Sequence, residues 1–293
     1  MIEDRAIVPT RLADLDTQRH VTSRTYEMAA WQGRYQLLLN NGFTLQQMYD
    51  DQTVITPVSN YCKFYREQQP PAQLNVHTRA YIGKNDQVYW LQEIYNNEKL
   101  DDLACRVITM TKAKKAKKKF KLFEQEPDFE SPKAIEIKGA GDMATLLKKP
   151  KAFNGSCKRV VSDYNMLFSE RGPFFTYAPG TIWRIFEEGR WAFGTAIGFG
   201  LKQIQQLDTT TFFTGATYHF AKIPEAGSQL KVYTWVEKVD KIRCFLRQDV
   251  TMKNDSKVLM SIREEQLIVS PSKRRPKKAP KEWMKLTGAY TEK

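Results

Sequence analysis

The feature that most constrains the fold is an internal repeat with a spacing of 156 residues. The segment GRYQLLLNNGFTLQQM, which starts at Gly33, resembles GRWAFGTAIGFGLKQI, which starts at Gly189. The same spacing aligns three further windows without a gap: QLNVHT with QLKVYT, Gln92 with Gln248, and Leu103 with Leu259. One spacing that serves four separated windows is hard to obtain by chance, and 293 residues are enough for two domains. The chain is therefore predicted to contain two copies of one domain.

Each copy shows the same order of predicted elements. In the first, an extended lead-in at residues 7–13 precedes an apolar-periodic helix over 24–41, which Gly42 ends. Four strand-like segments follow, at 53–66, 73–83, 87–96 and 102–111. In the second copy the predicted helix covers 181–197, and the strands cover 210–221, 228–239, 241–252 and 257–269. This order predicts an α+β fold in which an antiparallel sheet with one buried face wraps a long central helix.

Charge and periodicity set the expected domain boundaries. The net charge is +13, and two lysine-rich runs, at residues 112–121 and 271–281, fall where the periodic pattern stops. We expect a first domain over 1–113, a basic linker over 114–155, a second domain over 156–270 and a basic tail over 271–293, with linker and tail solvated. The runs either serve solubility alone or bind an acidic carrier protein or an anionic membrane. Nucleic acid is not expected, because no zinc-finger, RNP-like or helix-turn-helix pattern accompanies the charge.

The stretch DLDTQRHV, just ahead of the first helix, gathers acids, an amide and a histidine. It resembles the opening motif of hotdog-fold thioesterases of the 4-hydroxybenzoyl-CoA thioesterase-like and acyl-ACP thioesterase families, roughly D-x-D-x-x-x-H-V-N-N-x-x-Y. The motif stands here as Asp14, Asp16, His20, Val21, Thr22, Ser23 and Tyr26. Thr22 and Ser23 replace the two asparagines, and Gln18 occupies a place where acyl-ACP thioesterases tend to have asparagine. The other histidines, His77 and His219, lie in strand-like stretches and are expected to be structural.

The duplication resembles the double-hotdog acyl-ACP enzymes. The resemblance implies two tandem hotdog domains that form a pseudo-dimer. In the plant enzymes the catalytic motif belongs to the C-terminal copy, whereas here it lies in the N-terminal copy.

Thioester hydrolysis needs an activated water or a carboxylate nucleophile, together with donors aimed at the carbonyl oxygen. The resemblance implies that Asp16 is the general base or nucleophile and that His20 and Gln18 orient water or the acyl carbonyl. The N–H groups of Val21, Thr22 and Ser23, at a helix N-terminus, would form the oxyanion site. Plain helix capping would select similar residues, and Asp14 is expected to be a cap or surface acid.

The second copy lacks this chemistry. The spacing of 156 places Glu170 opposite Asp14, Gly172 opposite Asp16, Phe174 opposite Gln18 and Thr176 opposite His20. Only the first copy is therefore predicted to be catalytic. The predicted substrate pocket is lined by Tyr26, Phe174, Phe175, Tyr177 and Trp183. The alternative is that these aromatic residues are core.

The leading function is a thioesterase that hydrolyses an acyl group from CoA or acyl carrier protein. The alternatives are a non-catalytic acyl-binding module and a hotdog dehydratase-type enzyme. No cofactor or metal is expected, since the four cysteines are scattered without a CxxC spacing and are expected to be reduced thiols. The start lacks an apolar signal region, and no segment reaches the roughly 18 apolar residues of a membrane span, so a soluble, cytoplasmic protein is expected. A homodimer of two such chains stays open.

Overall fold

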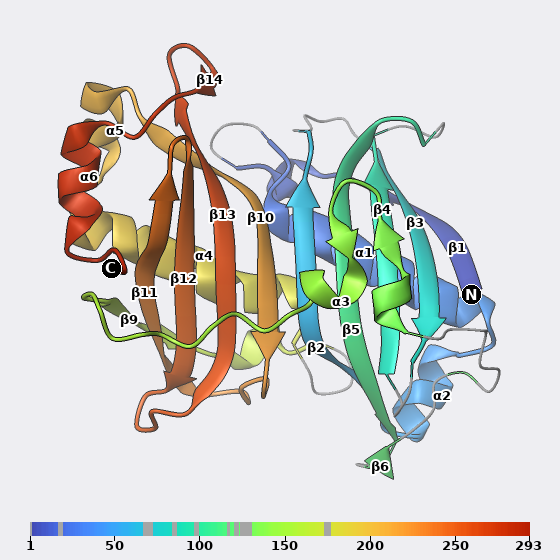
Figure 1. Cartoon of the computed structure of the whole chain (residues 1–293). Helices are drawn as coiled ribbons and strands as arrows, with labels where there is room; N and C mark the ends of the chain where they lie inside the picture. Colours follow the sequence, from blue (N-terminus) through green and yellow to red (C-terminus); the bar gives the residue numbers. More distant parts are fainter. Residues whose placement is uncertain are drawn as a thin grey trace. The chain divides into compact units, whose positions relative to one another are not determined.

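The computed structural model describes residues 2–16, 20–66, 73–83, 87–96, 100–115, 118–119, 123, 131–172 and 177–293. The chain forms two compact units: residues 1–148 with 171–181, and residues 149–170 with 182–293. Each copy of the repeat contributes one antiparallel sheet and one long helix (Figure 1). The predicted duplication of an α+β domain is thus confirmed.

The first sheet has the strand order β1-β3-β4-β5-β2, with all neighbours antiparallel. Its strands are β1 (Ile2–Pro9), β2 (Thr53–Phe64), β3 (Gln73–Ile82), β4 (Gln87–Tyr95) and β5 (Leu103–Lys115), with the short β6 (Lys118–Lys119) beside β5. The helices are α1 (Ser23–Asn40) and α2 (Leu45–Asp50), and the 3₁₀ turn η1 (Leu12–Asp14) precedes α1. Gly42, with φ +87°, follows the end of α1 as predicted.

The second sheet repeats this order as β9-β11-β12-β13-β10. Its strands are β9 (Val160–Asn165), β10 (Thr210–Phe220), β11 (Gln229–Asp240), β12 (Arg243–Met252) and β13 (Val258–Ser270), and β14 (Arg275–Pro276) pairs with β13. The helices are α4 (Pro179–Ala196), α5 (Leu201–Leu207) and α6 (Lys281–Gly288), with the 3₁₀ turn η3 (Phe168–Glu170). The four strand segments predicted after the helix in each copy agree with the structure to within a few residues, because alternation and turn residues mark them clearly. The extended lead-in predicted at 7–13 is wrong in its bounds, because β1 ends at Pro9 and η1 follows it.

A recurring glycine lets each central helix lie close to its sheet. A Cβ atom placed on Gly33 would lie 2.8 Å from Cγ1 of Val76, and one on Gly189 would lie 2.7 Å from Cγ1 of Val232. Both distances are shorter than real Cβ contacts, so only glycine fits without a shift. The repeat GR in the sequence therefore marks the closest approach of helix to sheet.

A recurring glutamine fastens the sheet to the helix backbone. Nε2 of Gln92 donates to the carbonyl of Ala30 at 2.5 Å, and Nε2 of Gln248 donates to the carbonyl of Phe186 at 3.0 Å. Both glutamines are fully buried. These bonds lie at equivalent positions, 156 residues apart.

A recurring arginine forms an ion pair with a buried acid in each unit, and the acid lies on different elements. In the first unit Arg34 donates to Glu27 of the same helix at 3.0 Å. In the second unit Arg190 donates to Glu264 of β13 at 2.8 Å. Arg34 is buried and Arg190 is half-buried. The two copies thus keep the arginine at the same position of the central helix and pair it with a buried acid from different places, as the buried acid requires. The interpretation of both arginines as structural agrees with this.

Part of the predicted linker over 114–155 is folded rather than solvated. Residues 131–148, here called the strap, contain η2 (Pro132–Ala134), β7 (Glu136–Ile137), β8 (Gly141–Asp142) and α3 (Met143–Leu146). The strap packs on the sheet face opposite α1, where Ile137, Met143 and Leu147 form one apolar cluster with Tyr81, Tyr89, Leu91 and Ile108. The prediction of a solvated linker is therefore wrong for residues 131–148.

The following segment lies against the outer face of the second sheet. The ring of Phe153 meets that of Trp235 edge-on at 5.0 Å, and the Arg159 guanidinium lies 4.3 Å from the Phe153 ring centre. Arg247 of the sheet donates to the carbonyl of Lys151. Residues 151–159 are thus tied to the second sheet by aromatic contacts and a hydrogen bond.

The predicted solvated tail over 271–293 is also folded in part. Helix α6 places Trp283, which is 4 % exposed, in an apolar cluster with Phe193, Ile197, Val236 and Leu246. The prediction is wrong here because it rested on the lysine-rich composition of the tail. Within the tail, two large apolar residues of α6, Trp283 and Leu286, recur at helical spacing and pack on the second unit. Of the helices that the structure describes, none is both long and apolar enough to cross a membrane.

All four cysteines are free thiols. Burial, with a smaller effect of Glu264, raises the pKa of Cys244 to about 12. Burial also raises the pKa of Cys105. Neither thiol is a nucleophile at neutral pH, because the thiolate is the reactive form.

Candidate active site

A tight loop immediately before α1 holds two of the predicted catalytic residues. Leu15 and Val21 form an antiparallel bridge, and the N–H of Asp16 donates to the carbonyl of His20 at 2.9 Å. Oδ1 of Asp16 accepts from the N–H of His20 at 2.9 Å. Asp16 is exposed and His20 is half-buried. The fold therefore holds Asp16 and His20 in one loop, where the backbone of His20 orients one carboxylate oxygen of Asp16. The catalytic roles of the two side chains stay predictions.

The start of α1 shows which backbone donors are already used. Oγ1 of Thr22 caps the helix by accepting from the N–H of Thr25 at 3.4 Å, and the N–H of Thr22 donates to the carbonyl of Asp14 at 2.9 Å. This second bond occupies the Thr22 N–H in the structure, so we remove it from the predicted oxyanion donors. The N–H groups of Val21 and Ser23 stay predictions.

Asp14 fixes the chain immediately before the loop through its bonds to Arg11. Its carboxylate accepts from the Arg11 N–H at 2.7 Å and from the Arg11 guanidinium at 3.1 and 3.2 Å. Burial alone would raise the pKa of Asp14, but the side-chain and backbone hydrogen bonds from Arg11 outweigh burial and lower it. Asp14 therefore acts as a structural acid, which agrees with the expected role as a cap.

The predicted pocket residues are distributed as follows. The Tyr26 ring is buried and lies edge-on to Phe64 at 5.3 Å. Trp183 is buried, stacks on Tyr218 at 4.8 Å and belongs to the core of the second unit. Tyr177 is buried as well. The predictions for Gln18, Phe174 and Phe175 concern positions outside the described residues. The role of the five pocket residues in acyl binding and the catalytic role of Gln18 stay predictions.

The second copy repeats the bridge that closes the loop but lacks the acid of the first copy. Arg171 and Tyr177 form an antiparallel bridge, and they lie 156 residues after Leu15 and Val21, the bridge that closes the first loop. The turn η3 likewise repeats η1 at this spacing. Gly172 stands at the position of Asp16. The backbone correspondence supports the prediction that only the first loop carries a carboxylate for chemistry.

Glu27 is a buried carboxylate that the sequence interpretation did not single out. Its Oε1 accepts from Arg34 at 3.0 Å, and its Oε2 accepts from Asn60 at 3.1 Å. Burial raises the pKa of Glu27, and Arg34 and Asn60 oppose this rise. With both oxygens occupied and 2 % exposure, Glu27 is a structural acid in this arrangement. The signal was available, because Arg34 follows Glu27 by seven residues, two helical turns, on the same helix face.

Comparison with known proteins gives relatives by structure only. No known protein-family model and no curated protein matches the sequence. A Lactobacillus plantarum protein provisionally assigned as an oleoyl thioesterase superposes with a TM-score of 0.71 at 7 % identity, covering 94 % of this chain and 97 % of its own.

Two further solved structures match over nearly their whole length. A 12:0-ACP thioesterase from Umbellularia californica has a TM-score of 0.66 at 9 % identity, covering 94 % of this chain and 95 % of its own. An acyl-ACP thioesterase from Bacteroides thetaiotaomicron has a TM-score of 0.57 at 9 % identity, covering 90 % of this chain and 97 % of its own. Identities this low establish the fold and not the activity. The chain has the double-hotdog fold that these structures share.

Proposed function

We propose that this protein hydrolyses acyl thioesters to a free acid and a thiol. The observation that carries the proposal is the loop in which the exposed carboxylate of Asp16 is held by the N–H of His20 at the N-terminus of the central helix. The same fold in acyl-ACP thioesterases supports it. A positioned carboxylate beside helix N–H groups is suited to acyl transfer to water.

In the proposed reaction, Asp16 takes a proton from a water that attacks the thioester carbonyl carbon. The carbonyl oxygen gains negative charge, which the N–H groups of Val21 and Ser23 and the dipole of α1 stabilise. The C–S bond then breaks, and the leaving thiolate takes up the proton. Direct attack by the Asp16 carboxylate, followed by hydrolysis of the anhydride, gives the same products. His20 and Gln18 orient the water or the carbonyl.

The proposed substrates are acyl-CoA or an acyl carrier protein, in the cytoplasm. The CoA phosphates and an acidic carrier would both be attracted by a chain with a net charge of +13. Tyr26, Phe174, Phe175, Tyr177 and Trp183 are proposed to contact the acyl chain.

The test is release of free thiol from a panel of acyl-CoA and acyl carrier protein substrates. We expect turnover with wild-type protein, and Asp16→Asn should keep the fold while lowering kcat by roughly 10² to 10⁴, the range of a positioned acid–base group. An Asp16→Asn variant within about threefold of wild type would refute the role of Asp16. Tight acyl-CoA binding without turnover of any substrate would instead identify a non-catalytic binding module.

A further inference from the structure

The two units differ at one equivalent corner, where the sheet meets the C-terminal half of the central helix. In the first unit this corner is filled by Trp90, which is fully buried. Its indole N–H donates to Oγ1 of Thr111 at 2.8 Å, and its ring lies 6.3 Å from that of Phe123. Phe43 closes the corner by meeting Phe123 edge-on at 5.9 Å. The first unit is therefore well packed here, with the indole donor satisfied.

In the second unit a leucine stands at the tryptophan position. The spacing of 156 maps Trp90 onto Leu246 and Phe43 onto Phe199. Trp283 of α6 takes the place of Phe123, and its ring meets that of Phe199 edge-on at 6.4 Å. Leucine is smaller than tryptophan, and a pocket of about 120 Å³ remains beside Leu246 and Trp283.

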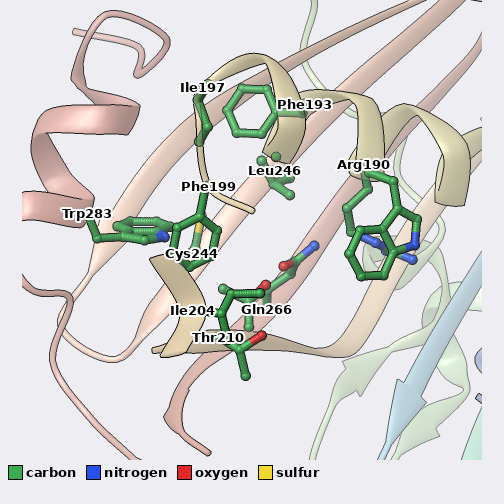
Figure 2. Close-up of a pocket in the computed structure, with 13 residues that line it drawn as sticks. Arg190, Phe193, Ile197, Phe199, Ile204, Thr210, Cys244, Leu246, Gln266 and Trp283 are labelled. Atoms are coloured by element: carbon green, nitrogen blue, oxygen red, sulfur yellow. The ribbon is translucent and has the colours of Figure 1, made fainter. Parts of the chain in front are cut away.

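The pocket is mostly apolar, and the buried indole donor of Trp283 lines it. Figure 2 shows side chains of α4, α5, β10, β12, β13 and α6 around it. Trp283 is 4 % exposed, and its Nε1–H has no hydrogen-bond partner among the residues that the structure describes. In Figure 2 the indole nitrogen lies on the side of the ring that faces Phe199 and Cys244. A buried donor without an acceptor is costly, and it indicates an acceptor supplied from outside the chain.

Water is a poor occupant at this donor. A buried water needs two to four polar partners, whereas the groups labelled beside the indole in Figure 2 are a phenyl ring and a protonated thiol. The charged lining residue, Arg190, is paired with Glu264 at 2.8 Å. The lining also includes Thr210, Thr211 and Gln266, and the amide nitrogen of Gln266 donates to Glu264 at 2.8 Å. The pocket therefore offers a mostly apolar wall and the neutral donor of Trp283, and the arginine in its lining is paired.

We propose that this pocket binds a small, uncharged aliphatic group that carries one oxygen acceptor, with the acceptor on Nε1–H of Trp283. An apolar cavity of roughly 150 Å³ accepts benzene, so a pocket of about 120 Å³ holds about five heavy atoms. The pocket is partly open to solvent, so the end of a slightly longer chain can project from it. This site lies within the second unit and is independent of the proposed hydrolysis at Asp16.

The probe is hexan-2-one, with n-hexane as the matched ligand without an acceptor. Binding is followed by the ¹H–¹⁵N indole signals of the six tryptophans, with the Trp283 signal assigned from its loss in Trp283→Phe. Hexan-2-one should move the Trp283 indole proton downfield in a saturable way, since its carbonyl accepts that hydrogen, and n-hexane should not. Absence of a saturable shift up to the solubility limit would overturn the proposal.

Two variants fill the pocket without relying on Trp283. In Gly194→Leu the new Cβ meets only the carbonyl oxygen of Phe199, at an ordinary 3.5 Å, so the variant should fold while its side chain occupies the pocket. It should abolish binding of hexan-2-one. Leu246→Trp, which copies the first unit, should do the same. The matched control Thr195→Leu adds the same side chain at an exposed position of α4 and should bind like wild type.

The hydrogen bond has its own control. Binding to Trp283→Phe is followed through the indole signal of Trp191, which also lines the pocket. This variant should bind hexan-2-one roughly three- to tenfold more weakly than wild type, the range of one neutral hydrogen bond, and bind n-hexane nearly as well as wild type does. Equal binding in wild type and Gly194→Leu, or an equal loss for both ligands in Trp283→Phe, would contradict the proposal. Asp16→Asn should bind hexan-2-one like wild type, so failure of the proposed hydrolysis would leave this result untouched.

Discussion

At the scale of single residues, the carboxylate of Asp208 joins the end of α5 to the end of β13. It follows α5 in a left-handed conformation with φ +45°, and it accepts from the N–H and Oγ of Ser272 at 3.0 and 2.9 Å. The hydroxyl of Ser270 also donates to it. The Ser270 hydrogen bond, followed by the Ser272 N–H, lowers the pKa of Asp208 from 3.8 to about 2. The ionised form is therefore the one that holds the end of β13.

This gives a pH-dependent prediction for Asp208→Asn. Because the folded pKa lies below the unfolded value, the carboxylate stabilises the fold fully above pH 3.8 and loses this effect as the pH falls toward about 2. Asparagine tolerates the left-handed conformation, so the change is confined to charge and acceptors. The Tm gap between wild type and Asp208→Asn should be constant near neutral pH and shrink below pH 4. A gap that is the same at all pH values would contradict this account.

The two copies of the loop give a second prediction. His20→Ala should lower kcat clearly but less than Asp16→Asn, because an orienting group contributes through geometry. Glu170 lies in the equivalent turn of the second copy and pairs with Arg184. Glu170→Ala should leave kcat nearly unchanged. Steady-state thiol release measures all three variants, and an inactive Glu170→Ala beside an active Asp16→Asn would place the chemistry in the other copy.

At the scale of elements, the recurring glycine predicts how helix and sheet respond to an added methyl group. Gly33→Ala would place a Cβ 2.7 Å from Oγ1 of Thr78, and α1 would have to move off the sheet. We expect a loss of about 1–3 kcal/mol in the free energy of unfolding, the usual result of overpacking. The control is Gly288→Ala at the end of α6, where the added Cβ would meet no other part of the protein within 4 Å. Denaturant unfolding should show the control unchanged or stabilised by up to about 1 kcal/mol.

The elements also show what the sequence could and could not predict. The central helices and main strands were predictable, because each carries a period that local sequence expresses. The strap and α6 were not predictable, because their few apolar residues, such as Ile137, Met143 and Trp283, lie in lysine-rich segments without a clear period. These residues are buried only because they pack against a sheet formed by distant parts of the chain.

The candidate site divides in the same way. The sequence motif placed Asp16 and His20 in one loop before the central helix, and their catalytic roles stay predictions. It could not show that the Thr22 N–H is taken by the Asp14 carbonyl, because that bond depends on how η1 meets α1. The pocket beside Trp283 could not be predicted either, although Trp90 and Leu246 align in the repeat. Whether the smaller leucine leaves a cavity depends on how the neighbouring side chains pack in the folded protein.

At the scale of the whole molecule, net charge predicts how a carrier would associate. The chain has an excess of 13 positive charges. Attraction to an acidic carrier or to CoA phosphates would be screened over about 10 Å at 0.1 M salt. Raising the salt to about half molar should raise KM more than it lowers kcat. The measurement is KM and kcat for thiol release across a salt series, with a KM that does not change counting against electrostatic binding.

The strap also determines where the gene can be divided if the first half is to be produced alone. Ending that half at the last main strand, near residue 115, would strip the outer face of its sheet and leave Tyr81, Tyr89, Leu91 and Ile108 bare. Such a fragment would carry an apolar patch prone to self-association. A fragment that runs through Lys148 keeps its own cover. The polypeptide that joins the copies is therefore also the shield that keeps the first copy dispersed in water.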